Sequence, residues 1–198
     1  MATRPPESGS AGSDSSTHSL RDADTETRID DTRIEELTEA APETMLRTAR
    51  ELLLEYGRFV IAQSGAARFC FGTLEKEADG LPASFLRQGG GSLLAFARGE
   101  PAGFVAWRAL ANPAVEPDSW ELKRLWVRPS GRGLRLGRRL TQAVLDRAIA
   151  AQRRAIYLDT APQSMTAAHR LYLEMGFHPC NCYNDNPVEG LAWLVKFL

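Results

Sequence analysis

Apolar residues divide the chain into an N-terminal segment without a core pattern and a longer region that has one. Residues 1–30 are dominated by Ser, Thr, Asp, Gly and Pro, and after the first residue their only large aliphatic side chains are Leu20 and Ile29. Such a segment buries too little apolar surface to offset the entropy lost on ordering it. We therefore expect a disordered tail over residues 1–30 and one folded domain over residues 31–198.

Apolar residues at helical spacing predict four helices in this domain. The first opens at Pro42 and buries a stripe that consists of Met45, Leu46, Ala49, Leu52, Leu53, Tyr56, Phe59 and Val60. Two more are expected over residues 71–81 and 136–151. The fourth is expected to be capped by Ser164 and to end at Gly176, because serine favours the start of a helix and glycine its end.

Shorter apolar runs bounded by turn formers predict the strands, which are residues 33–37, 92–97, 102–109, 120–127, 155–158, 177–183 and 191–197. Residues 98–101 read as a hairpin turn between two of them. Antiparallel strands thus lead into a strand–helix–strand–helix segment, which predicts an α/β domain of the α+β type with a mixed sheet. In the strand over residues 120–127 the alternation flips near Lys123, because Leu122 is apolar but so are Leu125 and Val127. A β-bulge produces this flip.

Overall composition narrows the range of functions only slightly. The formal net charge of −1 shows no global preference for nucleic acid or an anionic membrane. No apolar run approaches the ~20 residues of a membrane span, and the N-terminus lacks a secretory pattern. Three cysteines do not suggest a disulfide framework. We expect a cytoplasmic protein without membrane or nucleic-acid partners.

The segment over residues 121–140 carries the strongest chemical signal. It joins a predicted strand to a predicted helix through a loop that holds Gly131, Gly133 and Gly137. Seven cations lie in it, namely Lys123, Arg124, Arg128, Arg132, Arg135, Arg138 and Arg139. A helix N-terminus offers unpaired N–H groups, and glycines let the backbone approach a phosphate. The loop therefore predicts an anion site; a solvated basic turn and a nucleic-acid surface are the alternatives.

Two stretches resemble the GNAT superfamily of N-acetyltransferases. Residues 127–137, VRPSGRGLRLG, resemble its acetyl-CoA signature, and residues 169–177, HRLYLEMGF, resemble its second signature. The resemblance covers residues 33–198. It implies the GNAT fold, a central and mostly antiparallel sheet that is splayed at the acetyl-CoA site and flanked by helices. It also implies acetyl-CoA as co-substrate and transfer of its acetyl group to an amine.

The resemblance further implies the cofactor-binding residues. Backbone amides would hold the pyrophosphate along Arg132, Gly133, Leu134, Arg135, Leu136, Gly137 and Arg138. The strand edge at Leu125, Trp126 and Val127 would pair with the pantetheine arm, as in strand addition. Arg135 stands where the family usually has glycine. Its side chain either crowds the pyrophosphate and demands a different backbone angle, or its guanidinium reaches a phosphate.

Glu121 and Tyr172 are the implied catalytic residues. A carboxylate at the position of Glu121 would help to deprotonate the amine, through a water if needed, and Tyr172 would serve the departing sulfur. The structural alternatives are a surface charge for Glu121 and a core position for Tyr172. Met165 stands where the family often has asparagine. No metal is expected, since His178, Cys180 and Cys182 share one face of a strand without an evident fourth ligand.

The acceptor is not readable from these residues. A small-molecule amine such as an amino acid is the first expectation, and residues 69–71, Trp107 and the loop over residues 183–190 are candidates to lie near it. A protein or peptide amine is an alternative acceptor. A non-catalytic acyl-CoA sensor or interaction domain is the competing class, and a homodimer is compatible with either.

Overall fold

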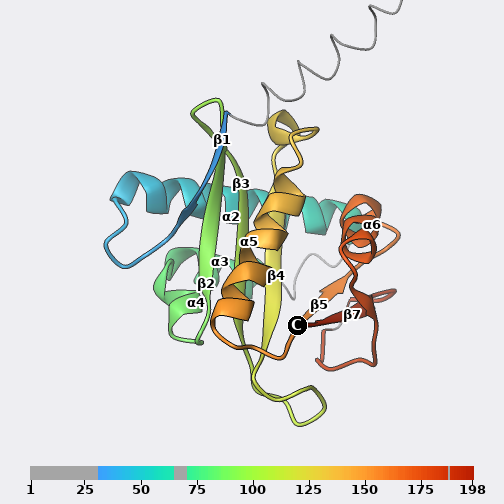
Figure 1. Ribbon diagram of the computed structural model, residues 1–198. Coiled ribbons are helices and arrows are strands. Elements are labelled where there is room, and N and C mark those ends of the chain that lie inside the picture. The colour runs from blue at the N-terminus through green and yellow to red at the C-terminus, as the bar shows by residue number, and fades with distance from the viewer. Residues whose placement is uncertain (1–30, 65–70, 187) are drawn as a thin grey trace, which may run out of the picture.

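A computed structural model describes residues 31–64, 71–186 and 188–198, so the tail predicted over residues 1–30 lies outside the described part. The chain folds into one mixed sheet with helices on both faces (Figure 1). Its elements are β1 (Thr32–Glu36), α2 (Glu43–Ser64), α3 (Phe71–Asp79), α4 (Ala83–Leu86), β2 (Gly91–Ala97), β3 (Glu100–Leu110), β4 (Ser119–Val127), a 3-10 turn η1 (Pro129–Gly131), α5 (Leu136–Ala150), β5 (Ala155–Thr160), α6 (Thr166–Glu174), β6 (His178–Pro179) and β7 (Ala192–Phe197).

The strand order is β1-β2-β3-β4-β5-β7-β6, and every neighbouring pair is antiparallel except β4 and β5. This confirms the predicted mixed, mostly antiparallel sheet. In the parallel pair only Trp120 with Ile156 and Glu121 with Tyr157 are in register. Beyond Glu121 the two strands separate, and the sheet is splayed there as expected.

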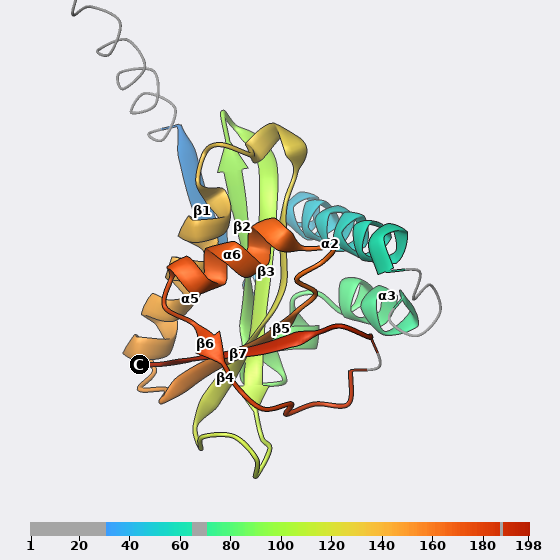
Figure 2. The same ribbon diagram turned by 90° about the vertical axis from the view of Figure 1, so that its right-hand side faces the viewer.

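Two apolar clusters fill the space between the sheet and the helices. One contains Leu136, Leu140 and Val144 of α5 packed against β2, β3, β4 and β5. The other contains Leu52 and Leu53 of α2 packed with α3 and α4 against the opposite face. Figure 2 shows α5 and α6 on one side of the sheet and α2 and α3 on the other.

Two local predictions were wrong. Helix α6 begins after Met165, whose backbone forms the N-cap, and no side chain caps it. The amide of Ser164 is already bonded to the carbonyl of Ala161 in the preceding turn, so the helix begins beyond it. The predicted strand over residues 177–183 is reduced to β6, a pair of residues that ends at Pro179. Tyr183 packs instead against Tyr157, with ring centroids 5.3 Å apart, and this takes the chain out of the sheet.

Candidate active site

A β-bulge interrupts β4 where the alternation of apolar residues flips. Ala106 pairs with Lys123 but Phe104 pairs with Trp126, so β4 holds one residue more than β3 at this point. Arg124 takes the extra position with a left-handed φ of 61°. The bulge predicted from the sequence is thereby confirmed, and it bends β4 away from β5.

The bulge also explains why apolar residues on both sides of it share one face. Leu122 before the bulge and Leu125 and Val127 after it all pack into the cluster under α5. Beyond Glu121 no described strand pairs with the β5-facing edge of β4, because the register of that pair ends there. The backbone edge at Leu125, Trp126 and Val127, where pantetheine binding is expected, is therefore open on this side.

The loop between β4 and α5 presents a row of backbone N–H groups. Among the described residues, the amides of Gly133, Leu134, Arg135, Leu136, Gly137 and Arg138 donate to no main-chain carbonyl. The amide of Arg132 differs, since it donates to the carbonyl of Pro129 at 3.2 Å. Unpaired N–H groups at the start of a 15-residue helix are the arrangement that binds a diphosphate.

Backbone angles explain how this loop turns. Gly133 has φ +80°, with open space where a Cβ would stand. Arg135 is the N-cap of α5 and also lies in the left-handed region, at φ 54° and ψ 20°. This conformation favours glycine, the residue usual there in the family that the sequence resembles, and Arg135 adopts it with its side chain exposed to solvent.

Most cations of the basic segment are paired with carboxylates. Arg128 donates to Glu55 at 2.7 Å, which lowers the pKa of Glu55 and raises that of Arg128. Arg124 is bonded to Glu77 and Arg138 to Glu174, each at 2.8 Å. Because these charges are neutralised internally, the segment is not a continuous cationic surface, which favours a local anion site over a nucleic-acid surface.

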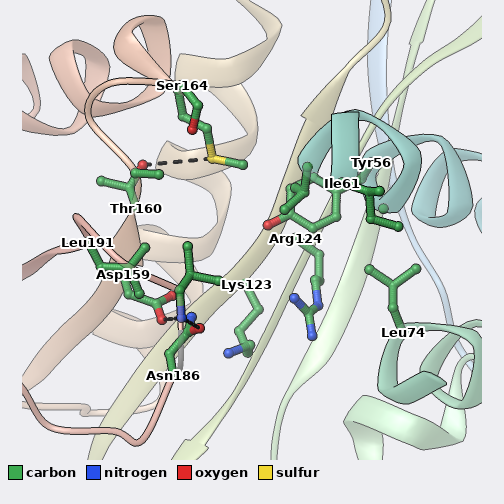
Figure 3. Close-up of a pocket in the computed structure, with 15 residues that line it drawn as sticks. Tyr56, Ile61, Leu74, Lys123, Arg124, Asp159, Thr160, Ser164, Asn186 and Leu191 are labelled. Atoms are coloured by element: carbon green, nitrogen blue, oxygen red, sulfur yellow. Dashed lines mark hydrogen bonds between the residues drawn. The ribbon is translucent and has the colours of Figure 1, made fainter. Parts of the chain in front are cut away.

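A pocket opens in the splay between β4 and β5, on the face covered by α2 and α3 (Figure 3). Its empty space, which includes the open mouth, is about 700 Å³. The lining residues are Tyr56, Gly57, Val60, Ile61, Leu74, Lys123, Arg124, Asp159, Thr160, Ala161, Ser164, Met165, Asn186, Val188 and Leu191. The loop before β7 thus contributes to the pocket, as one reading of the sequence expected.

The other candidates for the acceptor region are distributed differently. Trp107 is buried in the cluster under α5, where its ring lies 5.7 Å from that of Trp120, so it does not line the pocket. Residues 69 and 70 lie outside the described residues. Helix α3, which begins at Phe71, contributes Leu74 to the pocket wall.

Glu121 is fully buried behind the pocket rather than in its wall. Arg108 donates to its Oε2 at 2.7 Å, and its Oε1 accepts from the Tyr183 hydroxyl at 3.2 Å and from Lys123 at 3.3 Å. The Asn184 amide adds a fourth donor, at 3.3 Å from Oε1. The carboxylate therefore lies between two cations, Arg108 and Lys123.

A second carboxylate, which the sequence reasoning missed, does line the pocket. Asp159 lies near the end of β5, and its Oδ2 accepts from Asn186 at 2.7 Å and from Asn184 at 3.2 Å. Because Asn184 also donates to Glu121, one amide links the two carboxylates. A signal was present, since Asp159 directly follows the apolar strand predicted over residues 155–158, and ligands collect at the carboxyl ends of parallel strands.

Tyr172 lies on α6 and is 5% exposed, with its ring in an edge contact with Phe177. Among the described residues, none accepts a hydrogen bond from its hydroxyl. Burial raises the pKa of Tyr172 well above the ordinary value, and the pocket residues Tyr56 and Asp159 raise it further. The phenol is therefore neutral, and its hydroxyl keeps its donor capacity.

The comparisons with known proteins agree with this geometry. The sequence model of the Acetyltransferase (GNAT) family matches residues 45–177. The chain belongs to this family, which confirms the resemblance drawn from the two signatures. An uncharacterized N-acetyltransferase of Schizosaccharomyces pombe is 32% identical over 83 residues, or 42% of this chain and 50% of that protein. The match thus spans about half the length of that curated relative.

Solved structures share the fold. An acetyltransferase from Streptococcus agalactiae superimposes with a TM-score of 0.65 at 17% identity, over 85% of this chain and 99% of that one. The paiA N-acetyltransferase of Thermoplasma acidophilum in complex with coenzyme A gives 0.62 at 17% identity, over 84% and 99%. An acetyltransferase from Salmonella typhimurium with its cofactor acetyl-CoA gives 0.60 at 16% identity, over 84% and 94%. At these identities the likeness establishes the GNAT fold. In the described residues, no helix is both long and apolar enough to span a membrane.

Proposed function

We propose that the protein transfers the acetyl group of acetyl-CoA to the amine of a small molecule. The observation that carries the proposal is the row of unpaired amides from Gly133 to Arg138, which stands at the end of the open edge of β4. Family membership supports it, as do the structures of two GNAT-fold proteins that hold coenzyme A or acetyl-CoA. In this proposal the loop amides bind the diphosphate, and residues 125–127 pair with the pantetheine arm.

The splay lets the two substrates meet without an acyl-enzyme. The loop before α5 and the pocket beneath α2 lie at the same opening in the sheet, and they approach it from different sides. The amine nitrogen forms a bond to the acetyl carbon, and the carbon–sulfur bond breaks. Backbone amides near Leu125, at the bulge, would polarise the thioester oxygen. Holding both reactants in one gap supplies the proximity that a direct attack needs.

Two protons must leave the ammonium form of the acceptor. Asp159 faces the pocket and is placed to accept the first of them, which then passes to solvent. We assign Glu121 an indirect role, since it does not line the pocket and its link to Asp159 runs through Asn184. The second proton goes to the departing sulfur, which leaves as a thiol. Tyr172 would stabilise that sulfur by donating a hydrogen bond.

Enclosure of the pocket supports a small acceptor. Helices α2 and α3 and the loop that carries Asn186 and Val188 bound it on several sides, which leaves less room for a folded protein surface than for a metabolite. A peptide amine and a non-catalytic acyl-CoA sensor are the competing functions. One assay separates them: purified protein is mixed with acetyl-CoA and a panel of amines and peptides, and released CoA thiol is measured.

Calorimetry with coenzyme A completes this test. We expect heat of binding together with thiol release that depends on a small amine. Binding without release for any amine would show a sensor, and release with peptides alone would show a peptide acetyltransferase. The absence of any heat up to millimolar coenzyme A would refute the cofactor site itself.

A further inference from the structure

Lys123 and Asp159 stand opposite one another across the splay. Strands β4 and β5 are parallel, and Glu121 pairs with Tyr157 in the last register position. Lys123 and Asp159 follow two residues later on their strands, so both side chains lie on the same face as Glu121 and Tyr157. Because the strands have separated there, the pocket lies between these two residues, and both line it (Figure 3).

The other charges around the pocket are already matched. Arg124 holds Glu77 through two hydrogen bonds, at 2.8 and 3.2 Å. The pKa of Arg124 is raised: burial opposes the charge, but Tyr56 and Glu77 more than offset it. Glu121 has its closest contact, 2.7 Å, with Arg108. In each pair the two opposite charges neutralise one another.

Lys123 and Asp159 are less completely matched. Among the described residues, the one ion pair of Lys123 is a 3.3 Å contact with Glu121, whose charge Arg108 already neutralises. Asp159 accepts hydrogen bonds from two amides, and among the described residues no cation lies within 4 Å of its carboxylate. The cation of Lys123 and the anion of Asp159 thus face one pocket, and the protein does not fully neutralise either charge. Partly buried charges of this kind are stabilised by a ligand of the opposite sign.

We propose that the acceptor is an amine that also carries a carboxylate, such as an amino acid with an apolar side chain. The inference rests on the proposed function and specifies its substrate class. The ammonium of the acceptor lies at Asp159, and its carboxylate is held by Lys123. Ile61, Leu74 and Leu191 provide an apolar wall for the remainder. A polycationic acceptor is disfavoured, because its further charges would meet Lys123 and Arg124.

The transfer itself is unchanged by this specificity. The amine nitrogen replaces sulfur on the acetyl carbon, one proton leaves by way of Asp159, and another leaves on the thiol. Lys123 takes no part in bond making and acts by positioning the acceptor. Its contribution should therefore be visible in the choice of acceptor.

The test compares leucine with leucine methyl ester, which lacks only the negative charge, and adds spermidine as a polycation. Thiol release gives kcat/KM for each with the wild type, Lys123→Gln and the control Arg87→Gln. Arg87 is an exposed cation that does not line the pocket. A charged hydrogen bond contributes about 10- to 100-fold in binding. We expect Lys123→Gln to lower the ratio of leucine to ester by about that factor, and Arg87→Gln to preserve it.

The ratio of kcat/KM for leucine to that for its ester is compared between proteins, so the difference in amine basicity between the two compounds cancels. Retained coenzyme A affinity shows that the Lys123→Gln protein is folded, and Lys123→Arg should restore much of the ratio. The inference is overturned if wild-type protein prefers spermidine, or if Lys123→Gln lowers activity on acid and ester by the same factor. If no thiol were released with these amines or with any amine of a wider panel, that result would instead count against the proposed function.

Discussion

Replacing Arg135 by glycine should raise stability and weaken cofactor binding at once. Arg135 occupies the left-handed region at φ 54°, which costs a residue with a Cβ about 1–2 kcal/mol. Glycine removes this strain, but it also makes the unfolded chain more flexible, which destabilises the folded protein by about 0.5–1 kcal/mol. The net gain is about 0.5–1 kcal/mol, or about 1–4 °C in Tm for a chain of this size. The exposed guanidinium beside the free amides is expected to contact a cofactor phosphate, so its loss should weaken coenzyme A binding about 10-fold.

Arg98 offers a matched control for this variant. It is also an exposed arginine in the left-handed region, at φ 53°, but it lies in the hairpin between β2 and β3. Arg98→Gly should raise Tm by a similar amount and leave coenzyme A affinity unchanged. Thermal unfolding and calorimetric titration of the two variants and the wild type measure both quantities. If Arg135→Gly bound coenzyme A as tightly as Arg98→Gly does, the guanidinium would have no part in binding the cofactor.

Three further substitutions test the site and its supports. Glu121→Gln should destabilise the protein by about 3 kcal/mol in denaturant unfolding, because two cations lose their buried counter-charge; a loss below 1 kcal/mol would contradict this account. Tyr172→Phe should lower kcat about 10-fold or more with coenzyme A affinity retained; an unchanged kcat would assign Tyr172 to packing alone. Arg128 lowers the pKa of Glu55 in the folded state. The ion pair therefore stabilises the folded protein fully at pH values above the pKa of Glu55 in the unfolded chain, about 4.3. This stabilisation is lost as the pH falls through the lower pKa that Glu55 has in the folded state. Glu55→Gln should therefore cost about 1 kcal/mol at pH 7 and progressively less in acid, and a cost that did not change with pH would refute the ion pair.

Local sequence patterns determined much of this protein. The periodicity of Leu52 and Leu53 in α2 and of Leu136 and Leu140 in α5 predicted helices that the structure contains. The flipped alternation around Lys123 predicted the bulge, because side-chain direction along a strand depends only on neighbouring residues. The glycine and arginine loop before α5 predicted the row of free amides for the same reason, since turns and helix starts are local structures.

Only the tertiary structure decided what the residues of the pocket can do. Asp159, Asn184 and Asn186 belong to segments that pack together after the sheet has formed, and no spacing in the sequence places them beside Glu121. The burial of Glu121, and with it the shift of the proposed proton acceptor to Asp159, depends on Arg108 from the neighbouring strand. Charge balance, burial and pocket shape arise from contacts between distant residues, whereas helices, strands and bulges arise from contacts between near ones.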